Sequence, residues 1–202
     1  MGDFTCEIYH GRTLEYFDEP HVYLVDGILV PSITSVLKKH FGGRYDGIPA
    51  AVLERAAEAG TAVHEAIEQY VKTGRETPLP ELRGFRYLQK KHGFEVLDSE
   101  LPVILFGEDG NPIAAGRLDL VLKKDGQIGG ADIKRTSRLD KEYLTAQLNL
   151  YRLAYEQSYG EPWTFLAGLH LREDTRKWVD IPIEPGTPLE IINKYFDKEI
   201  TQ

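Results

Sequence analysis

The pattern of apolar and polar positions predicts β-strands in the middle of the chain and helices around them. The segment 116–122 alternates with a period of two, which indicates a half-buried strand. Its leucines, Leu118, Leu120 and Leu122, would share the packing face, and Asp119 would point to the other face. This strand therefore carries one carboxylate away from the core.

A second strand follows after a short turn. Asp132 and Lys134 would share one face of this strand, and Ile133 between them would point to the packing side. The residues 123–127 carry a turn signal, so we expect the two strands to pair as a hairpin. That hairpin would bring the carboxylates of Asp119 and Asp132 close to the ammonium group of Lys134.

Helical periodicity and capping residues predict the rest of the framework. Gln147 and Tyr151 lie one turn apart on one face of a helix. Thr61 could begin a new helix after Gly60, and His64 would border the buried stripe of that helix. The expected helices are one capped by Ser32 or Thr34 and reaching Phe41, then 50–71 with the interruption at Gly60-Thr61, 81–92, 141–159 and 189–200. The other expected strands are 13–17, 21–25, 28–30, 95–105, 163–171 and 177–183.

Three polar residues on the expected strands have more than one interpretation. His21 and Tyr23 lie on one strand face, where packing or hydrogen bonding is favoured over contact with a substrate. Glu100 lies on the long strand 95–105, where it either faces solvent or contributes to a metal site.

Length and composition limit the class of protein. A chain of 202 residues fits one domain with a substantial hydrophobic core. The single cysteine, Cys6, excludes an internal disulfide framework and an iron–sulfur cluster. The sequence has neither an apolar run of bilayer length nor a signal-peptide pattern, so we expect a soluble, cytoplasmic protein without membrane contact.

The formal net charge of −8 argues against nonspecific wrapping of duplex DNA, which usually requires a basic excess. If the chain binds nucleic acid, a local patch must do so. The densest basic run consists of Lys134, Arg135, Arg138 and Lys141, and a solvated loop is an equally good interpretation of that run.

The predicted cluster of acids and amine requires an explanation. Desolvating such a cluster offsets most of the Coulombic gain, so it is rarely built for stability. A divalent cation held by oxygen ligands would explain why Asp119 and Asp132 lie together. The alternative is that Asp132 and Lys134 form a surface ion pair that contributes little.

An ordered set of motifs resembles those of the PD-(D/E)XK nuclease superfamily, in particular its RecB-like exonuclease branch. The matching segments are Gly60–His64, Glu100, Gly116–Asp119, Asp132–Lys134 and Gln147–Tyr151. The N-terminal segments 18–24 and 31–37 are similar to the leader of phage-type members and of mitochondrial genome maintenance exonucleases. The cysteine cluster of the iron–sulfur members is missing.

This resemblance implies an α/β fold with a restriction-endonuclease-like core, in which helices flank a central mixed β-sheet. One nuclease domain would span residues 1–202. It would comprise an N-terminal hairpin and helix (1–45), a catalytic core (46–160), and a C-terminal hairpin and helix (161–202).

The resemblance also implies roles for individual residues. One or two Mg²⁺ or Mn²⁺ ions would be held by His64, Glu100, Asp119, Asp132 and the backbone carbonyl of Ile133. The imidazole ligand favours Mn²⁺ over Ca²⁺. The catalytic residues would be Asp119, Asp132, Lys134, Gln147 and Tyr151. Among them, Lys134 would orient or help to deprotonate the attacking water. Arg117, Arg135 and Arg138 are candidate phosphate contacts.

The expected function is a metal-dependent DNA exonuclease acting on the ends of single-stranded DNA, since an acidic protein is poorly suited to coating duplex. Two alternatives remain. One is a module with a nuclease fold that binds nucleic acid or protein without cutting, and the other is a structure-specific endonuclease.

Overall fold

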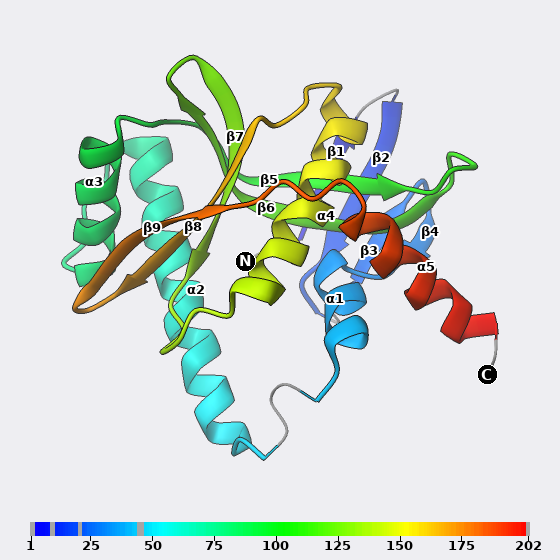
Figure 1. Cartoon of the computed structure of the whole chain (residues 1–202), viewed down its shortest axis with the longest axis horizontal. Coiled ribbons are helices and arrows are strands. Elements are labelled where there is room, and N and C mark those ends of the chain that lie inside the picture. The colour runs from blue at the N-terminus through cyan, green and yellow to red at the C-terminus, as the bar shows by residue number, and fades with distance from the viewer. Residues whose placement is uncertain (1–2, 9–10, 20–21, 44–46, 201–202) are drawn as a thin grey trace.

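The computed structural model describes residues 3–8, 11–19, 22–43 and 47–200, and side chains up to residue 196. Its N-terminal sheet is antiparallel in the order β1 (Phe4–Ile8), β2 (Arg12–Phe17), β3 (Val22–Val25) and β4 (Ile28–Val30). The central sheet follows the order β5 (Glu95–Phe106), β6 (Pro112–Lys124), β7 (Gln127–Lys134), β8 (Phe165–Arg172) and β9 (Thr175–Ile181). The helices are α1 (Ile33–Phe41), α2 (Ala50–Thr73), α3 (Pro80–His92), α4 (Lys141–Tyr159) and α5 (Thr187–Ile200) (Figure 1).

The central sheet is mixed. Its strand pairs are antiparallel except for β7 and β8, which run parallel and are connected through α4. A parallel pair requires such a crossover, because a tight turn cannot return the chain to the start of the neighbouring strand. The predicted α/β core, a mixed sheet flanked by helices, is thereby confirmed.

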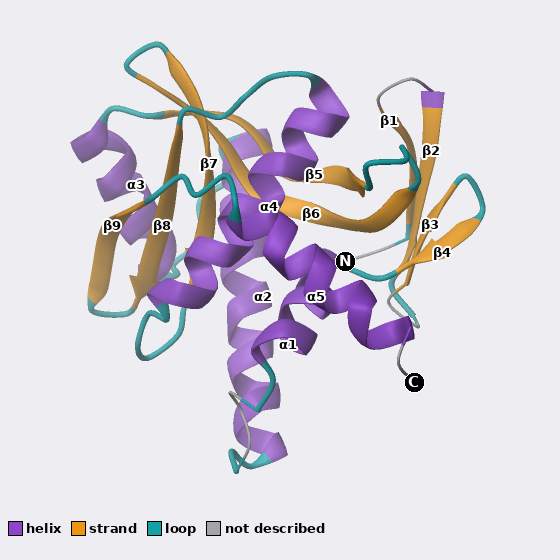
Figure 2. Ribbon diagram, turned by 45° about the vertical axis from the view of Figure 1, so that its right-hand side comes forward, coloured by secondary structure: helices purple, strands orange, loops and turns teal. Residues whose placement is uncertain are grey.

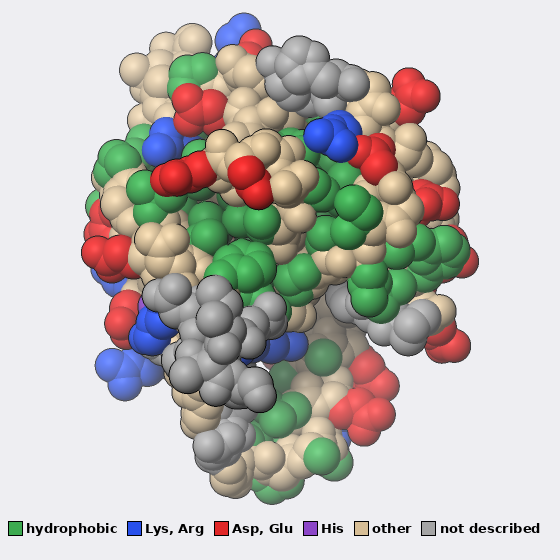
Figure 3. All heavy atoms as spheres, turned by 90° about the vertical axis from the view of Figure 1, so that its right-hand side faces the viewer, with side chains coloured by type: hydrophobic (Ala, Val, Ile, Leu, Met, Phe, Trp, Pro, Cys, Tyr) green, Lys and Arg blue, Asp and Glu red, His purple; other side chains and the backbone are tan. Residues whose placement is uncertain are grey.

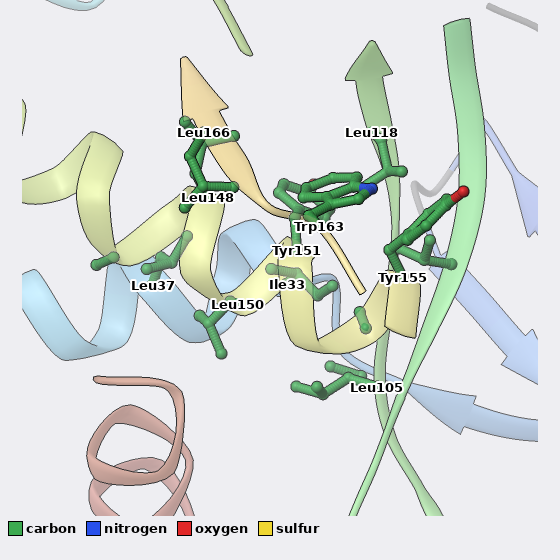
Figure 4. Packing of buried hydrophobic residues seen from close by; sticks show 14 of the residues in the cluster. Ile33, Leu37, Leu105, Leu118, Leu148, Leu150, Tyr151, Tyr155, Trp163 and Leu166 are labelled. Carbon is green, nitrogen blue, oxygen red and sulfur yellow. The ribbon is translucent and has the colours of Figure 1, made fainter. Parts of the chain in front are cut away.

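Helices cover both faces of the central sheet. On one face, α1, α4 and α5 enclose a core cluster that includes Ile33, Leu148 and Trp163 (Figures 2 and 4). On the other face, α2 and α3 pack on β6, β7 and β8 through residues such as Ile67 and Phe85. β7 is therefore buried between two helical layers, and its end lies where both layers can supply side chains.

Two glycines let β7 pass beneath aromatic side chains. A Cβ atom at Gly130 would lie 2.0 Å from the ring of Trp163, and one at Gly129 would lie 2.6 Å from the ring of Phe165. Since heavy atoms do not approach so closely, glycine is required at both positions for steric reasons. Trp163 then stacks on Tyr155 of α4, with ring centroids 4.9 Å apart.

Local capping explains the predicted bounds of two helices. The Ser32 hydroxyl accepts a hydrogen bond from the Ser35 N–H at 3.0 Å and begins α1. The Asp140 carboxylate accepts from the Tyr143 N–H at 3.1 Å and begins α4, which ends at the left-handed Gly160. Both helices agree with the prediction.

The predicted interruption of α2 is wrong. The helix runs without a break from Ala50 to Thr73 through Gly60 and Thr61. An internal glycine costs only about 1 kcal/mol relative to alanine, and burial of Val63 and Ile67 outweighs that cost. Continuity fixes the orientation of His64 relative to the whole helix.

The prediction that Leu118, Leu120 and Leu122 share one packing face is also wrong. Leu118 belongs to the cluster with α4, whereas Leu120 and Leu122 belong to the cluster with α2 and α3. The change of side occurs at Asp119, where the β5–β6 ladder is interrupted. Period-two reading assumes an uninterrupted pleat and therefore fails at this point.

The N-terminal sheet packs against the ends of β5 and β6. Ile104 and Ala115 join its core cluster, and the Ala115 N–H donates to the Pro31 carbonyl at 3.1 Å. The predicted strands at 13–17 and 28–30 are confirmed, β3 confirms 22–25, and β1 was not predicted. His21 lies outside the described residues.

The face that carries this sheet shows hydrophobic side chains beside scattered acidic ones (Figure 3). In the N-terminal sheet, Ile28 and Leu29 of β4 are 55% and 64% exposed. In the described part of the chain, every helix is too short or too polar to cross a membrane.

Candidate metal centre

The first carboxylate of the centre lies where β6 and β7 separate. Their ladder ends at the pair Leu120–Ala131, so Asp119 and Asp132 face each other one step beyond it. There the Ile133 N–H donates to the Asp119 carboxylate at 2.6 Å instead of to the neighbouring backbone. This contact holds Asp119 at the end of β7 and leaves its other oxygen, Oδ1, for a further partner.

Glu100 provides the second carboxylate from β5. The residues on either side of Glu100 pair with β6 as Ser99–Leu120 and Leu101–Leu118. Glu100 therefore lies opposite Asp119, although Glu100 and Asp119 do not form a ladder pair themselves. Glu100 has a φ of 54°, a left-handed conformation that is rare outside glycine. Such strain persists only where surrounding structure enforces it, and it is common at functional sites.

His64 of α2 completes the group from the opposite layer. Its Nδ1 atom lies 3.4 Å from Oε1 of Glu100 and 3.6 Å from Oδ1 of Asp119. Its Nε2 atom lies 3.3 Å from the Ile133 carbonyl oxygen. The ligand atoms of His64, Glu100 and Asp119, named here the His64 cluster, all lie within 4.8 Å of one another.

Asp132 and Lys134 lie beside the His64 cluster. Lys134 Nζ contacts Asp132 Oδ2 at 2.7 Å, and Asp132 is 3% exposed. Burial raises the pKa of Asp132 to about 6, and the negative charge of Asp119 acts in the same direction. The predicted gathering of two carboxylates and one ammonium group is confirmed.

Protons and cations balance the buried acids of this centre. Burial alone would lower the pKa of His64, but the charges of Asp119 and Glu100 outweigh it and raise that pKa to about 9. For Lys134, burial again lowers the pKa, and Asp132 and Asp119 reverse the shift to a net increase. Burial also raises the pKa of Asp119. At neutral pH, therefore, His64 is protonated, and its positive charge offsets the carboxylates of Asp119 and Glu100 as a bound cation would.

Tyr151 of α4 links two of the predicted motifs. A Cβ atom at Gly116 would lie 3.1 Å from the ring and from the hydroxyl of Tyr151, so the glycine makes room for this side chain. Burial raises the pKa of Tyr151 well above its ordinary value, and the nearby acids add to that rise. Tyr151 therefore stays protonated and can donate a hydrogen bond.

Gln147, one turn before Tyr151, lines a pocket of about 220 Å³ together with Lys134. The side chain is 5% exposed, and among the described residues its Oε1 atom has no hydrogen-bond partner. A buried amide without a partner is costly, so this atom is available to a ligand. The structure thus places both members of the predicted helix motif beside the centre.

Arg117 is held by the N-terminal sheet rather than directed to solvent. Its guanidinium lies 5.1 Å from the Tyr16 ring centroid and 5.5 Å from that of Phe4, and it lies 3.8 Å from Glu100. Tyr23 belongs to the same neighbourhood. Burial raises the pKa of Tyr23, Arg117 lowers it, and Glu100 raises it. The sequence favoured packing or hydrogen bonding for Tyr23, and the buried side chain beside Arg117 agrees with that, but no local pattern showed that β3 approaches β6.

The other two predicted phosphate contacts differ from each other. Arg135 donates through Nε to the buried Glu81 at 2.8 Å, which ties the loop after β7 to the beginning of α3. Arg138 is exposed in the loop before α4. Of these two, Arg138 is therefore the one already directed to solvent.

The left-handed conformation of Glu100 makes a testable prediction. In urea denaturation, we expect the free energy of unfolding of Glu100→Gly to exceed that of Glu100→Ala by about 1 kcal/mol. The reason is that only glycine adopts positive φ without strain. At the exposed Lys123 of β6, which pairs with both β5 and β7, the order should reverse, since glycine weakens an ordinary strand. Equal stability of the two Glu100 variants would show that the backbone there is unstrained.

Comparison with known proteins adds little. No protein-family model matches the sequence, and no curated protein matches it. A solved structure described as the crystal structure of SSO0001 is similar with a TM-score of 0.45 and 15% sequence identity, over 86% of this chain and 76% of that one. A likeness this distant carries no function across.

Proposed function

We propose that this protein is a metal-dependent nuclease of the PD-(D/E)XK superfamily that hydrolyses phosphodiester bonds in DNA. The observation that carries the proposal is the His64 cluster with the adjoining Asp132 and Lys134. Three elements distant in sequence, α2, β5 and β6, converge on one spot with buried acids whose ionised forms are disfavoured by burial. Perturbed groups gathered in this way are characteristic of functional sites.

The donor set fits Mg²⁺ or Mn²⁺. Asp119, Glu100 and the Ile133 carbonyl offer hard oxygen ligands, and Asp132 lies next to them. His64 adds a nitrogen ligand, which suits Mn²⁺. When bound, the ion would supply a Lewis acid that lowers the pKa of a water and offsets charge on the phosphate.

The remaining residues would bind and orient the substrate. With its raised pKa, Lys134 is an ammonium group at neutral pH, so it is suited to hold a water or offset phosphate charge rather than to remove a proton. Tyr151 can donate a hydrogen bond, and the unpartnered amide oxygen of Gln147 can accept one. Asp132 positions the Lys134 ammonium through their 2.7 Å contact.

Net charge bears on the form of the substrate. With a formal charge of −8, the protein repels the dense phosphate array of duplex DNA. This favours single-stranded DNA over duplex as substrate, and action on free ends is proposed from the resemblance to RecB-like exonucleases.

The decisive experiment is a cleavage panel with Lys134→Ala. We expect wild type with Mn²⁺ or Mg²⁺ to degrade linear single-stranded DNA, and Lys134→Ala to be slower by about 10²–10³-fold. Covalently closed circles should survive, and their cleavage would indicate an endonuclease instead. The control variant is Lys38→Ala, which removes an exposed lysine of α1. If wild type and Lys134→Ala show the same background on every substrate, the protein is not this nuclease.

A further inference from the structure

Helix α3 exposes a basic and aromatic stripe that the metal centre does not use. Arg83, Arg86, Tyr87 and Lys90, named here the α3 stripe, follow the spacing i, i+3, i+4 and i+7 and therefore share one helical face. All four are exposed, whereas Leu82, Phe85 and Leu88 on the opposite face are buried. Over this length the helix rises about 10 Å.

The stripe borders a hollow of about 430 Å³ between α3 and α2. Its lining consists of Tyr70, Arg83, Arg86, Tyr87, Gln89 and Lys90. Three cations and two phenol rings meet here, and the lining has no carboxylate among the described residues. This concentration of positive charge is notable on a chain whose net charge is −8.

The rings and the guanidinium groups of this surface lie close to each other. The Arg86 guanidinium is 5.6 Å from the Tyr70 ring centroid, and the Arg176 guanidinium of β9 is 4.8 Å from that of Tyr87. One exposed acid, Glu76, contacts Arg86 at 2.5 Å. Because both partners of that ion pair are well exposed, the pair contributes little and can open for a stronger anion.

The stripe is structurally connected to the metal centre. Glu81, in the first turn of α3, accepts a hydrogen bond from Arg135, the residue that follows Lys134. Tyr70 of the hollow lies on the same helix as His64, about 9 Å further along its axis. Figure 1 shows α3 beside the C-terminal part of α2, on the outer side of the central sheet.

We propose that the α3 stripe binds the backbone and bases of single-stranded DNA at a distance from the scissile bond. The proposal rests on the proposed nuclease function for its placement of the strand. Sequence-independent binding of single strands combines cations for the phosphates with aromatic rings on which bases stack. An acidic protein partner would use the cations but would leave the exposed ring of Tyr87 without a comparable role.

The test measures binding without cleavage. A labelled oligothymidylate of about 20 nucleotides is titrated with protein in EDTA at several salt concentrations. In the triple variant Arg83→Gln, Arg86→Gln, Lys90→Gln, we expect affinity at about 0.1 M salt to fall at least tenfold. The log–log slope against salt should become shallower by about 2, since each phosphate contact in a single strand contributes about 0.7.

A matched triple variant controls for net charge. Lys38→Gln, Arg55→Gln, Lys177→Gln removes three exposed cations from α1, α2 and β9, and should change affinity less than twofold. Stacking is tested separately. Tyr87→Ala should weaken binding about fivefold or more, whereas Tyr87→Phe, which keeps the ring, should remain within twofold of wild type.

Equal binding by the stripe variant and its matched control would overturn the inference. The inference would also be overturned if the stripe substitutions weakened the binding of poly-glutamate but left the binding of DNA unchanged. That result would assign the surface to an acidic protein. If wild type cleaves DNA but stripe variants bind normally, only the stripe inference fails. A third outcome is that wild type cleaves no substrate, while the stripe variant loses DNA binding and the matched control variant keeps it. In that case the nuclease proposal fails and the stripe inference stands.

Discussion

Asp119→Asn is expected to abolish Mn²⁺ binding and metal-dependent cleavage without weakening the fold. The substitution removes one of the two carboxylates that face His64 Nδ1, at 3.6 Å, while the amide oxygen can still accept the Ile133 N–H. We expect cleavage to fall by about 10³-fold or more, which corresponds to a barrier increase of about 4 kcal/mol. Calorimetry with Mn²⁺ should show no binding at concentrations that saturate wild type.

The stability of the same variant separates a metal role from a structural one. Because burial raises the pKa of Asp119, its ionised form is unfavourable in the folded protein relative to a neutral side chain. The metal-free variant should therefore unfold at the same temperature as wild type or a higher one. Asp174→Asn, in the exposed turn between β8 and β9, is the control and should retain Mn²⁺ binding. Mn²⁺ binding of wild-type strength in Asp119→Asn would remove this residue from the centre.

Manganese affinity is expected to rise steeply with pH, through His64. The pKa of His64 is raised to about 9 in the metal-free protein, so a metal ion must displace a proton at any lower pH. Between about pH 6.5 and 8.5, we expect the affinity of wild type to increase about tenfold per pH unit. His64→Gln should bind Mn²⁺ more weakly and with a flatter pH dependence.

The free energy of unfolding of the metal-free protein should fall with rising pH, whereas Mn²⁺ affinity rises. The folded pKa of His64 lies above its ordinary value of 6.5, so the bound proton stabilises the fold fully below pH 6.5. This contribution, on the order of 3 kcal/mol, is lost as pH rises toward 9. His64→Gln should lack this loss, and His92→Gln, at the end of α3, should keep it. Parallel pH profiles of wild type and His64→Gln would contradict the assignment.

The placement of the candidate site residues on helices and strands could be predicted where their local patterns are strong. The hairpin of β6 and β7 follows from alternation and a turn, and the capping residue Ser32 determines where α1 begins. Gln147 and Tyr151 share a face because they lie four residues apart on one helix. Each of these features depends on neighbours within a few residues, which a sequence displays directly.

The predictions that failed concern packing between distant segments. The interruption at Gly60 was wrong because burial of one face of α2 outweighs a weak local preference. The common face of the three leucines was wrong because the strand changes side at Asp119. The contact of Arg135 with the buried Glu81 likewise joins distant segments, and no local signal indicated it, while the expected phosphate contact of Arg135 stays a prediction.

By itself, the sequence determined most of the helices and strands from residue 12 onward, the pairing of β6 with β7, and the identity of the acids, imidazole and amine. Tertiary structure alone decided that Glu100 lies opposite Asp119 in a left-handed conformation, that Tyr23 and Arg117 adjoin it, and that Arg135 pairs with the buried Glu81. The physical reason is range. Hydrogen-bonded turns, caps and periodic faces are local, whereas burial and charge in a site depend on segments brought together only by the packed fold.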